Sequence, residues 1–404
     1  MPKSAYSQIF SSSRLKQAWT EMWKSSSRYS APGVDGLTPA EFDKNSDGYL
    51  ESLGQKLRGD YVFSSLRPFA VPKSNGKERL ICVPTVADRL VQRVIVAHLM
   101  SRPGATRLLN EVSFGFLKTR GVVAARDRAI ELRLSHGWAY KSDISAFFDN
   151  INRSQVIREV DRLFRQPSLR NIILASASCE IAETDEAIKR LIYSGGIRRG
   201  SGVRQGMPIA PFFSNVILEK FDRSMIDAGH NLVRYADDFI VFADSRAECE
   251  KVDALARKLL APLGLSIPSL DEGGKTTIYE PWEMAEFLGM GLELQPNGTY
   301  ALKITDAQKS KISEKISIFR DADYLFKNRI SVHEVHRRVQ NAIGGYRSAY
   351  AAAANIADLE PMFSSALMDT TRRIYETAFG KEAVAKLKPN LCAVLGISEF
   401  PPRR

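Results

Sequence analysis

The sequence predicts an α+β protein in which β-hairpins come first and a helical segment comes last. Three hairpins are indicated over 61–85, 232–242 and 286–304, where short apolar runs flank the pairs or triplets Ser-Asn-Gly, Asp-Asp and Asn-Gly. From about residue 305 the pattern is helical and basic, with an expected break near Gly344-Gly345. Strands followed by helices are typical of an α+β body with a helical C-terminal module.

Helices are expected between the first two hairpins. Thr38 and Pro39 have the residue types favoured at the N-cap and the first position of a helix, and Asp88 is expected to cap another helix. The sequence further predicts an Arg-rich helix over 119–136, a strand with a turn and the start of a helix over 138–151, and mostly helix over 152–192.

A glycine-rich loop over 195–211 precedes a helix with a clear apolar stripe. The stripe repeats every fourth residue through Phe213, Ile217, Phe221 and Met225, which predicts core packing. After the Asp-Asp hairpin, a further helix is expected over 246–261.

Composition favours a polyanionic partner. The chain has 404 residues, enough for two or three domains, and its 57 Lys and Arg exceed its 46 Asp and Glu, giving a net charge of +11. This balance favours nucleic acid first and a membrane surface second. The four cysteines form no CxxC pair, and no secretory signal or membrane span is seen, so we expect a cytoplasmic protein without membrane attachment.

Asp237 and Asp238 interrupt an apolar strand, where ionised carboxylates are costly to bury. They can form an ordinary solvated turn. The more specific interpretation is a hairpin tip that holds a divalent cation, because Mg²⁺ takes carboxylate oxygens and lets phosphates complete its shell. A third acid, Asp143, ends another short strand, although it can also be a helix N-cap. Acids on separate strands can hold two metals for phosphoryl transfer.

The order of short motifs resembles that of bacterial reverse transcriptases of the group II intron-like type, in the branch that stands alone or is associated with defence. The fingers motifs are similar to GVDG (33–36), RPFAVPKSNGKERLICVPT (67–85) and SFGF (113–116), and palm motifs A to E are similar to SDISAFFD (142–149), RQGMPIAP (204–211), YADD (235–238), LGLSI with GGKT (263–276) and EFLG (286–289). The resemblance implies a right-hand polymerase fold: an N-terminal extension (1–30), fingers and palm with an antiparallel palm sheet (31–304), a helical thumb (305–365) and a C-terminal helical tail (366–404).

The resemblance also implies a catalytic set. Asp143, Asp237 and Asp238 are expected to hold two Mg²⁺ ions, with Mn²⁺ as a possible substitute, and Lys275 is expected to protonate the leaving pyrophosphate. Phe148 is expected to lie under the sugar of the incoming nucleotide and exclude a 2′-hydroxyl, unless it is a core residue.

Further residues are expected to contact the nucleotide. Lys73 and Arg79 flank the turn of the first hairpin and can bind a triphosphate, or can simply form a solvated basic turn. Gln205 and Gly206 are expected to contact the nucleotide or the template base, with a turn-to-helix boundary as the alternative.

Nucleic-acid contacts are expected from two segments. Arg198 and Arg204 can touch phosphates from the glycine-rich loop or merely keep it solvated. In the expected thumb, charge and aromatic rings mix in a way that suits backbone contact and base stacking, and the candidates are Arg337, Arg338, Tyr346 and Arg347. An ordinary packed helix with a solvated face is the alternative.

The sequence therefore predicts an RNA-directed DNA polymerase that uses dNTPs to copy a structured non-coding RNA encoded nearby, with a role in anti-phage defence by analogy. Two alternatives stay open: a template-independent or protein-primed DNA polymerase, and a non-catalytic RNA-binding assembly protein. Oligomeric state is not predicted.

Overall fold

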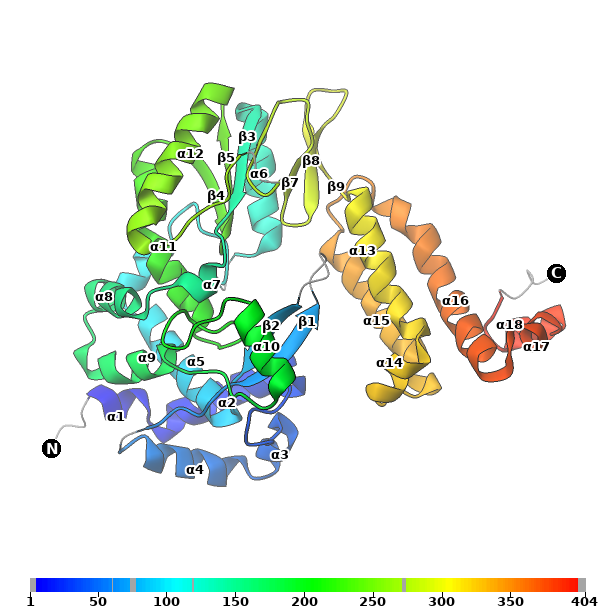
Figure 1. Ribbon diagram of the computed structural model, residues 1–404, viewed down its shortest axis with the longest axis horizontal. Coiled ribbons are helices and arrows are strands. Elements are labelled where there is room, and N and C mark those ends of the chain that lie inside the picture. The colour runs from blue at the N-terminus through cyan, green and yellow to red at the C-terminus, as the bar shows by residue number, and fades with distance from the viewer. Residues whose placement is uncertain (1–4, 60, 73–77, 118–119, 271–273, 399–404) are drawn as a thin grey trace. The chain divides into compact units, whose positions relative to one another are not determined.

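The computed structural model describes residues 5–59, 61–72, 78–117, 120–270 and 274–398, which fall into two compact units (Figure 1). The first unit comprises Met1–Glu280 and the second Pro281–Arg404. We predicted the end of the fingers and palm at residue 304, so the division between the units comes earlier in the chain than that boundary.

A four-stranded antiparallel sheet forms the framework of the first unit, in the order β4-β5-β3-β6. Its strands are β3 (Trp138–Asp143), β4 (Asn231–Tyr235), β5 (Asp238–Ala243) and β6 (Thr277–Tyr279). The strands of the Asp-Asp hairpin are β4 and β5, as predicted, and the antiparallel palm sheet is confirmed.

Helices α11 (Ala210–Asp227) and α12 (Arg246–Leu260) cover one face of this sheet. On that face the Tyr140 hydroxyl of β3 donates to Asp253 of α12 at 2.8 Å, and the rings of Phe221 and Phe239 lie 5.4 Å apart. Because side chains alternate along a strand, positions 143 and 238 point to the opposite face.

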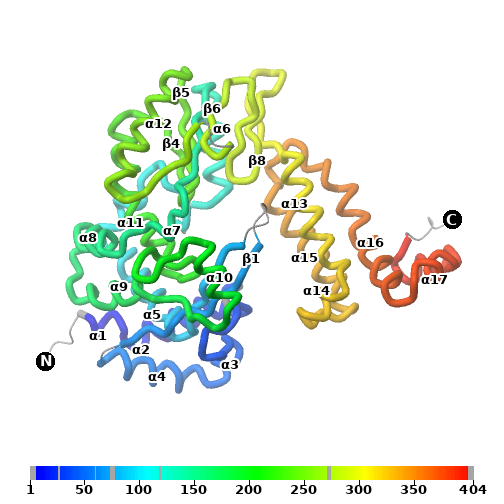
Figure 2. Tube along the Cα trace, in the orientation of Figure 1, coloured from blue at the N-terminus to red at the C-terminus, as the bar shows by residue number. Residues whose placement is uncertain are grey.

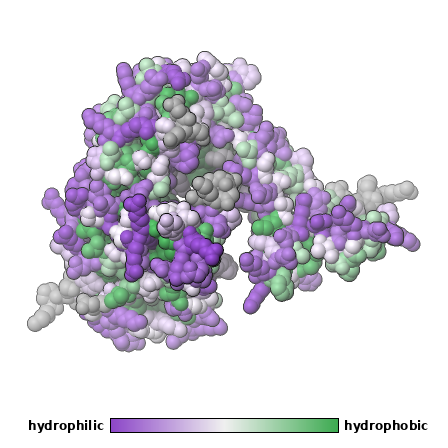
Figure 3. Space-filling model, in the orientation of Figure 1, coloured by the Kyte–Doolittle hydropathy of each residue, from purple (hydrophilic) through white to green (hydrophobic). Residues whose placement is uncertain are grey.

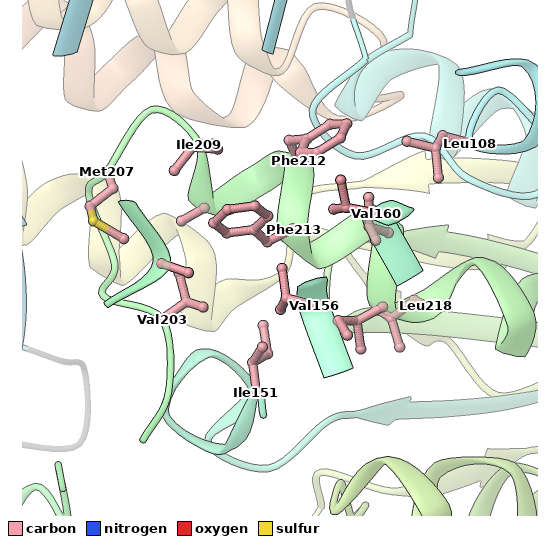
Figure 4. Close-up of a cluster of buried hydrophobic side chains, with 14 of the residues drawn as sticks. Leu108, Ile151, Val156, Val160, Val203, Met207, Ile209, Phe212, Phe213 and Leu218 are labelled. Atoms are coloured by element: carbon pink, nitrogen blue, oxygen red, sulfur yellow. The ribbon is translucent and has the colours of Figure 1, made fainter. Parts of the chain in front are cut away.

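The apolar stripe of α11 is in the core, as predicted. Phe213, Ile217, Phe221 and Met225 are all buried. Figure 4 shows side chains of α11, of the loop before it and of α8 (Arg153–Phe164) gathered in one cluster. Full burial of one such side chain contributes roughly 1.5–3 kcal/mol, so this cluster anchors the second half of the glycine-rich loop, from Val203 onward.

The first predicted hairpin is present as β1 (Arg67–Pro72) and β2 (Glu78–Val83), which pair in antiparallel register. Its turn, including Lys73, lies outside the described residues. The helix that follows, α5 (Val86–Met100), is capped by Thr85, whose hydroxyl accepts from the Asp88 backbone N–H at 3.1 Å. The prediction that Asp88 is the cap was wrong because Asp88 lies inside the first turn, where its carboxylate instead accepts a hydrogen bond from the Tyr61 hydroxyl.

The predicted N-terminal extension is an integral part of the first unit. Helix α2 (Ser12–Lys24) buries Leu15, Trp19 and Met22 in the same hydrophobic core as α5, and Figure 2 shows α2 running beside α5. The other N-terminal helices are α1 (Ala5–Ile9), α3 (Pro39–Lys44) and α4 (Ser46–Lys56). Thr38 caps α3 with Pro39 at its start, as predicted.

The remaining helices of the first unit connect the hairpin, the sheet and the glycine-rich loop. They are α6 (Val122–Ser135), α7 (Phe147–Asn150), α9 (Arg170–Ala177) and α10 (Glu186–Ser194). Helix α10 lies against β2 and buries none of its own residues. In the space-filling view of Figure 3, hydrophilic residues cover most of the visible face, as the high charge of the chain implies.

The second unit combines a small sheet with helices. Strands β7 (Ala285–Phe287), β8 (Met290–Leu294) and β9 (Tyr300–Lys303) form an antiparallel sheet, so the predicted third hairpin is present with one additional strand. The helices are α13 (Asp306–Ser317), α14 (Ala322–Lys327), α15 (Val332–Ala349), α16 (Glu360–Phe379), α17 (Lys381–Ala385) and α18 (Pro389–Val394). Asn355 ties sheet to helices, because its side chain exchanges hydrogen bonds with both backbone groups of Ile304, at 2.8 and 3.1 Å.

The expected break near Gly344-Gly345 was wrong. Helix α15 continues through Gly344 and Gly345, since glycine lowers helix stability by only about 1 kcal/mol and buried Val339 and Ile343 hold the helix in place. The expected boundary between thumb and tail at residues 365 and 366 falls inside α16. In the described part of the chain, no helix is both long and apolar enough to cross a membrane.

Candidate polymerase active site

The three predicted acids lie at the same end of the four-stranded sheet. Asp143 is the last residue of β3 and pairs in register with Asp238, the first residue of β5. Asp237 occupies the turn between β4 and β5, and its carbonyl accepts a hydrogen bond from the Ile144 backbone N–H at 3.1 Å. The antiparallel pairing of β3 with the hairpin thus brings together carboxylates that are far apart in the sequence.

Burial and mutual repulsion act on these carboxylates together. Burial raises the pKa of Asp237, and the charge of Asp143 adds to the increase. Burial also raises the pKa of Asp238 to about 6. Lys141, whose Nζ lies 3.8 Å from Asp238 Oδ1, opposes that shift. The site therefore concentrates negative charge that the protein alone neutralises only in part.

Two carboxylate oxygens of this cluster are buried and receive no hydrogen bond from the described residues. They are Asp143 Oδ1 and Asp238 Oδ1. Buried polar atoms are normally satisfied, and an unsatisfied carboxylate oxygen is a ligand of the type that a hard cation prefers. In the described residues there is no group of three or more His, Cys, Asp or Glu side chains that could hold a metal ion. The two oxygens are of the chemical type that fits Mg²⁺ where one or two carboxylates share the ion with substrate phosphates.

Lys275 reaches the same cluster from the segment before β6. Its Nζ lies 3.0 Å from Asp143 Oδ2, and its side chain is 64% exposed. The predicted acid and the predicted metal ligand are thus ion-paired with each other. An exposed pair of this kind contributes little to stability, so the lysine can leave it at little cost.

The neighbouring side chains of Phe147 and Phe148 differ in exposure. Phe147 is only 2% exposed, whereas Phe148 is half-buried, and the two rings lie 5.3 Å apart. The Phe148 carbonyl accepts from the Val203 N–H at 2.7 Å, which fastens this turn to the glycine-rich loop. A contact of Phe148 with a nucleotide stays a prediction.

The glycine-rich loop docks on the first hairpin. The Cys82 N–H of β2 donates to the Gln205 carbonyl at 2.7 Å. Gly206 has a φ of 103°, and a Cβ at this position would lie 2.3 Å from the Cys82 carbonyl oxygen, so only glycine fits. Exposed Arg79 and half-buried Gln205 line one cavity at this junction, together with Leu191 of α10.

Comparison with known proteins assigns the family. The model of the family "Reverse transcriptase (RNA-dependent DNA polymerase)" matches residues 71–292, which is more than half of the chain. The chain belongs to this reverse transcriptase family. The match extends from β1 to β8 and so includes all three acids, Phe148, the glycine-rich loop and Lys275.

Curated relatives agree with this assignment. The chain is 29% identical over 199 residues to protein YkfC of Escherichia coli (48% of this chain, 49% of YkfC). It is 22% identical over 241 residues to the group II intron-encoded protein LtrA of Lactococcus lactis (57% and 38%) and 24% identical over 204 residues to the retron Mx65 reverse transcriptase of Myxococcus xanthus (49% and 45%). The chain thus matches about half or less of the length of each relative.

Two solved structures are similar to parts of this chain. A partial Cas6-RT-Cas1–Cas2 complex matches with a TM-score of 0.36 and 24% identity, covering 63% of this chain and 41% of the other. Telomerase from Candida albicans, in complex with a fragment of telomeric RNA, matches with a TM-score of 0.40 and 10% identity, covering 87% and 69%.

Arg204 of this reverse transcriptase departs from the sequence-based expectation. It is 2% exposed, and its Nη2 donates to Glu180 Oε2 and to the Arg198 carbonyl, both at 2.7 Å. The expectation that Arg204 contacts phosphate from a solvated loop was therefore wrong in its premise, since the side chain points into the protein. Arg198 and its neighbour Arg199 are exposed, so a phosphate contact of Arg198 stays a prediction.

Glu180 is a residue of this region that the sequence did not single out. It accepts hydrogen bonds from Arg153 Nη1 and from the Gly200 N–H, each at 2.8 Å, besides the one from Arg204. Opposing cations hold the pKa of Glu180 below its usual value despite burial. Nothing in its local sequence marks it, because its partners come from a helix and a loop that meet only in the folded chain.

The predicted thumb residues differ in availability. Arg337 and Arg338 are exposed and share Glu334 at the long distances of 3.5 and 4.0 Å. Arg347 makes two hydrogen bonds with Glu360, of 2.9 and 2.5 Å, and Tyr346 is half-buried. Arg337 and Arg338 are thus more available for contact with nucleic acid than Arg347 is.

Proposed function

We propose that this protein is an RNA-directed DNA polymerase that extends a primer with dNTPs by two-metal phosphoryl transfer. The observation that carries the proposal is the pair of unsatisfied oxygens on Asp143 and Asp238, beside Asp237, in a chain of the reverse transcriptase family. Three neighbouring acids that the protein neutralises only in part are a liability in a protein that only binds RNA.

Asp143, Asp237 and Asp238 would hold the divalent cations, Mg²⁺ with Mn²⁺ as a possible substitute, which on binding activate the primer hydroxyl and neutralise the leaving pyrophosphate. The fixed pairing of β3 with β5 keeps two of these carboxylates in place, so little reorganisation is needed when substrate binds.

Other side chains would bind and orient the nucleotide. Arg79 is exposed on β2 and can bind the triphosphate with its planar fork. Gln205 and Gly206 would contact the nucleotide or the template base from the loop that docks on β2. Phe148 would exclude a 2′-hydroxyl by its bulk. Lys275 would leave Asp143 and donate its Nζ proton to the pyrophosphate oxygen as the P–O bond breaks.

We extend the proposal to a structured RNA as template, encoded nearby, with DNA as product and a role in anti-phage defence. Support for the RNA comes from the net charge of +11, the exposed arginines of the loop and α15, and the likeness to group II intron and retron proteins. The defence role is proposed from the sequence resemblance to stand-alone bacterial enzymes. A cytoplasmic location is proposed because all four cysteines are free thiols.

The experiment that tests the proposal is purification from the native host, followed by sequencing of all bound RNA and DNA and by primer extension on the enriched RNA. We expect one enriched RNA, DNA complementary to it, and dNTP incorporation that needs Mg²⁺. DNA that is unrelated to the bound RNA, or is covalently attached to the protein, would favour the template-independent or protein-primed alternative. Bound RNA without any DNA synthesis would favour the assembly protein.

A further inference from the structure

A buried arginine lies directly behind the catalytic turn. Arg234 belongs to β4 and is 0% exposed. Its Nε and Nη2 donate to the two carboxylate oxygens of Asp222 on α11, each at 2.5 Å, and Asp222 is 1% exposed. The pair lies on the helix-covered face of the sheet, opposite to the face of Asp143 and Asp238.

The rest of this guanidinium is also fully used. Nη1 donates to Asn215 Oδ1 at 3.2 Å and to the Ala236 carbonyl at 3.0 Å, and Nη2 donates to Ser113 Oγ at 2.9 Å. Together with the two bonds to Asp222, these contacts use all five N–H donors that an arginine has. A lysine has three donors on one atom and cannot reproduce this planar arrangement.

The hydrogen bond from Arg234 to the Ala236 carbonyl connects this arginine to the active site, because Ala236 directly precedes Asp237. Ala236 has a φ of 60°, in the left-handed region that residues with a Cβ rarely adopt. Arg234 fixes its carbonyl from one side, and the Ile144 N–H fixes the next carbonyl, that of Asp237, from the other. Both peptide groups beside the Asp237 side chain are therefore held.

The segment 113–116 packs against the turn that contains Ala236. A Cβ at Gly115 would lie 2.5 Å from the Ala236 nitrogen, so the two backbones are in direct contact. Asn215 holds Gly115 in turn, since its Nδ2 donates to the Gly115 carbonyl at 3.0 Å. Asn215 thus connects the segment to Arg234 as well.

Stability alone gives a weak reason for such a pair. Replacing a buried ion pair with apolar residues is often neutral or stabilising, because both charges lose their hydration. The ion pair with Asp222 instead holds the Arg234 guanidinium in one orientation, so that each of its N–H groups points in a fixed direction. Resting on the proposed function, we propose that Arg234 is a positioning residue, which holds the left-handed Ala236 turn so that the Asp237 carboxylate is presented to the catalytic cations.

The test compares Arg234→Lys, which keeps the charge, with Arg257→Lys as a matched control. Arg257 makes the same two-bond pair with an aspartate, Asp253, and donates to the backbone carbonyls of Ile267 and Pro268, which lie outside the turn. The measurements are Mn²⁺ binding to the free protein by the electron paramagnetic resonance signal of unbound Mn²⁺, the Mg²⁺ concentration for half-maximal primer extension, and the RNA dissociation constant.

For Arg234→Lys we expect Mn²⁺ binding to weaken about tenfold, the Mg²⁺ requirement to rise by a similar factor, and RNA affinity to stay within twofold of wild type. Arg257→Lys is expected to leave Mn²⁺ binding within twofold. A folded Arg234→Lys protein with wild-type Mn²⁺ affinity would overturn the proposal. If Arg234→Lys does not fold, Ser113→Ala decides, since it removes one contact of Arg234 while keeping the Asp222 pair; a two- to fivefold weakening of Mn²⁺ binding supports the proposal, and no change overturns it.

The same measurements distinguish a failure of the positioning role from a failure of the proposed polymerase function. A wild-type protein that binds no Mn²⁺ and synthesises no DNA contradicts the polymerase itself. An active wild type together with an equally active Arg234→Lys variant contradicts only the positioning role.

Discussion

Asp143 and Asp238 face each other across β3 and β5, and each has one buried carboxylate oxygen to which no donor of the described residues forms a hydrogen bond. Such an arrangement lowers the stability of the metal-free protein, because two like charges are held together and partly desolvated. The same arrangement favours any cation that binds there. The acid cluster therefore lowers stability without a cation and gains stability when a cation binds.

Replacing Asp238 with Asn should stabilise the metal-free protein. The folded-state pKa of Asp238 is raised to about 6 from 3.8, so the folded state holds this proton more tightly than the unfolded state does. The carboxylate therefore destabilises the fold above pH 6, by up to about 3 kcal/mol, and this cost is relieved as the pH falls from 6 towards 4. At pH 7 we expect Asp238→Asn to raise the free energy of unfolding by about 1–3 kcal/mol, with a smaller gain at pH 5.

Denaturant unfolding with and without Mg²⁺ measures this effect. Asp227→Asn, at an exposed aspartate paired with Arg223, is the control and should change stability little at either pH. Mg²⁺ should stabilise the wild type but not Asp238→Asn. A variant that is less stable than wild type at pH 7 would show that Asp238 has structural partners and is no cation ligand.

Removing both hairpin acids should abolish synthesis while leaving RNA binding intact. In the double variant Asp237→Ala with Asp238→Ala, we expect primer extension to fall by about a thousandfold or more, because metal ions supply several kcal/mol of transition-state stabilisation. RNA affinity, measured by filter binding, should stay within a factor of about two. Retained nucleotide incorporation would refute the assignment of the site.

Phe148→Ala should admit ribonucleotides. The ring is half-buried at the edge of the hydrophobic core, five residues after Asp143, and its loss would open space for a 2′-hydroxyl. We expect the preference for dNTPs over rNTPs, as a ratio of kcat/KM values, to fall by about ten- to a hundredfold, which corresponds to roughly 1.4–2.8 kcal/mol. Phe147→Ala is the matched control: it should lower stability by about 3–5 kcal/mol and leave the sugar preference unchanged. Unchanged sugar selectivity in Phe148→Ala would make Phe148 a packing residue.

Much of the palm could be predicted because its signals are local. The alternating apolar strands, the stripe of α11 and the turn residues each lie within a few positions of one another, and these short periods determine element type. The acids could be found for the same reason, since Asp237 and Asp238 interrupt an apolar run and so mark themselves. Asp143 and Asp238 are brought together by strand pairing, and the order of the motifs predicted that they belong to one site.

The features that could not be predicted depend on distant contacts. Arg204 reads as a solvated loop residue, and only the folded position of Glu180 makes it a buried ion-pair partner. Four of the five hydrogen bonds of Arg234 go to α11 and to Ser113, far from Arg234 in the sequence, so no short sequence window contains them. The first unit ends before the small sheet, and contacts of that sheet with later residues, such as the hydrogen bonds of Asn355 to Ile304, are equally distant in the sequence.

Glu180→Gln should loosen the glycine-rich loop. The change removes the charge that Arg153 and Arg204 share and leaves buried Arg204 without its counter-ion. Because the loop carries Gln205 and Gly206, we expect the KM for dNTPs to rise about five- to tenfold, roughly 1–1.4 kcal/mol, with a smaller change in kcat. Steady-state primer extension measures both. Glu186→Gln, which breaks an exposed pair with Lys189, should change neither; equal effects of the two variants would remove the loop from nucleotide binding.

Replacing Arg337 and Arg338 together with Gln should weaken RNA binding and flatten its salt dependence. Both side chains are exposed on α15, and their shared partner Glu334 lies at 3.5 and 4.0 Å, so both are free to contact phosphate. Each lost phosphate contact should reduce the slope of log K against log salt by about 0.7, giving a total reduction of about 1.4 for single-stranded RNA. Arg347→Gln should reduce the slope less, because Glu360 already neutralises Arg347 through two hydrogen bonds. Titrations at several salt concentrations separate the cases: an unchanged slope in the double variant would mean that α15 presents an ordinary solvated face, and a larger change in Arg347→Gln would mean that RNA displaces Glu360.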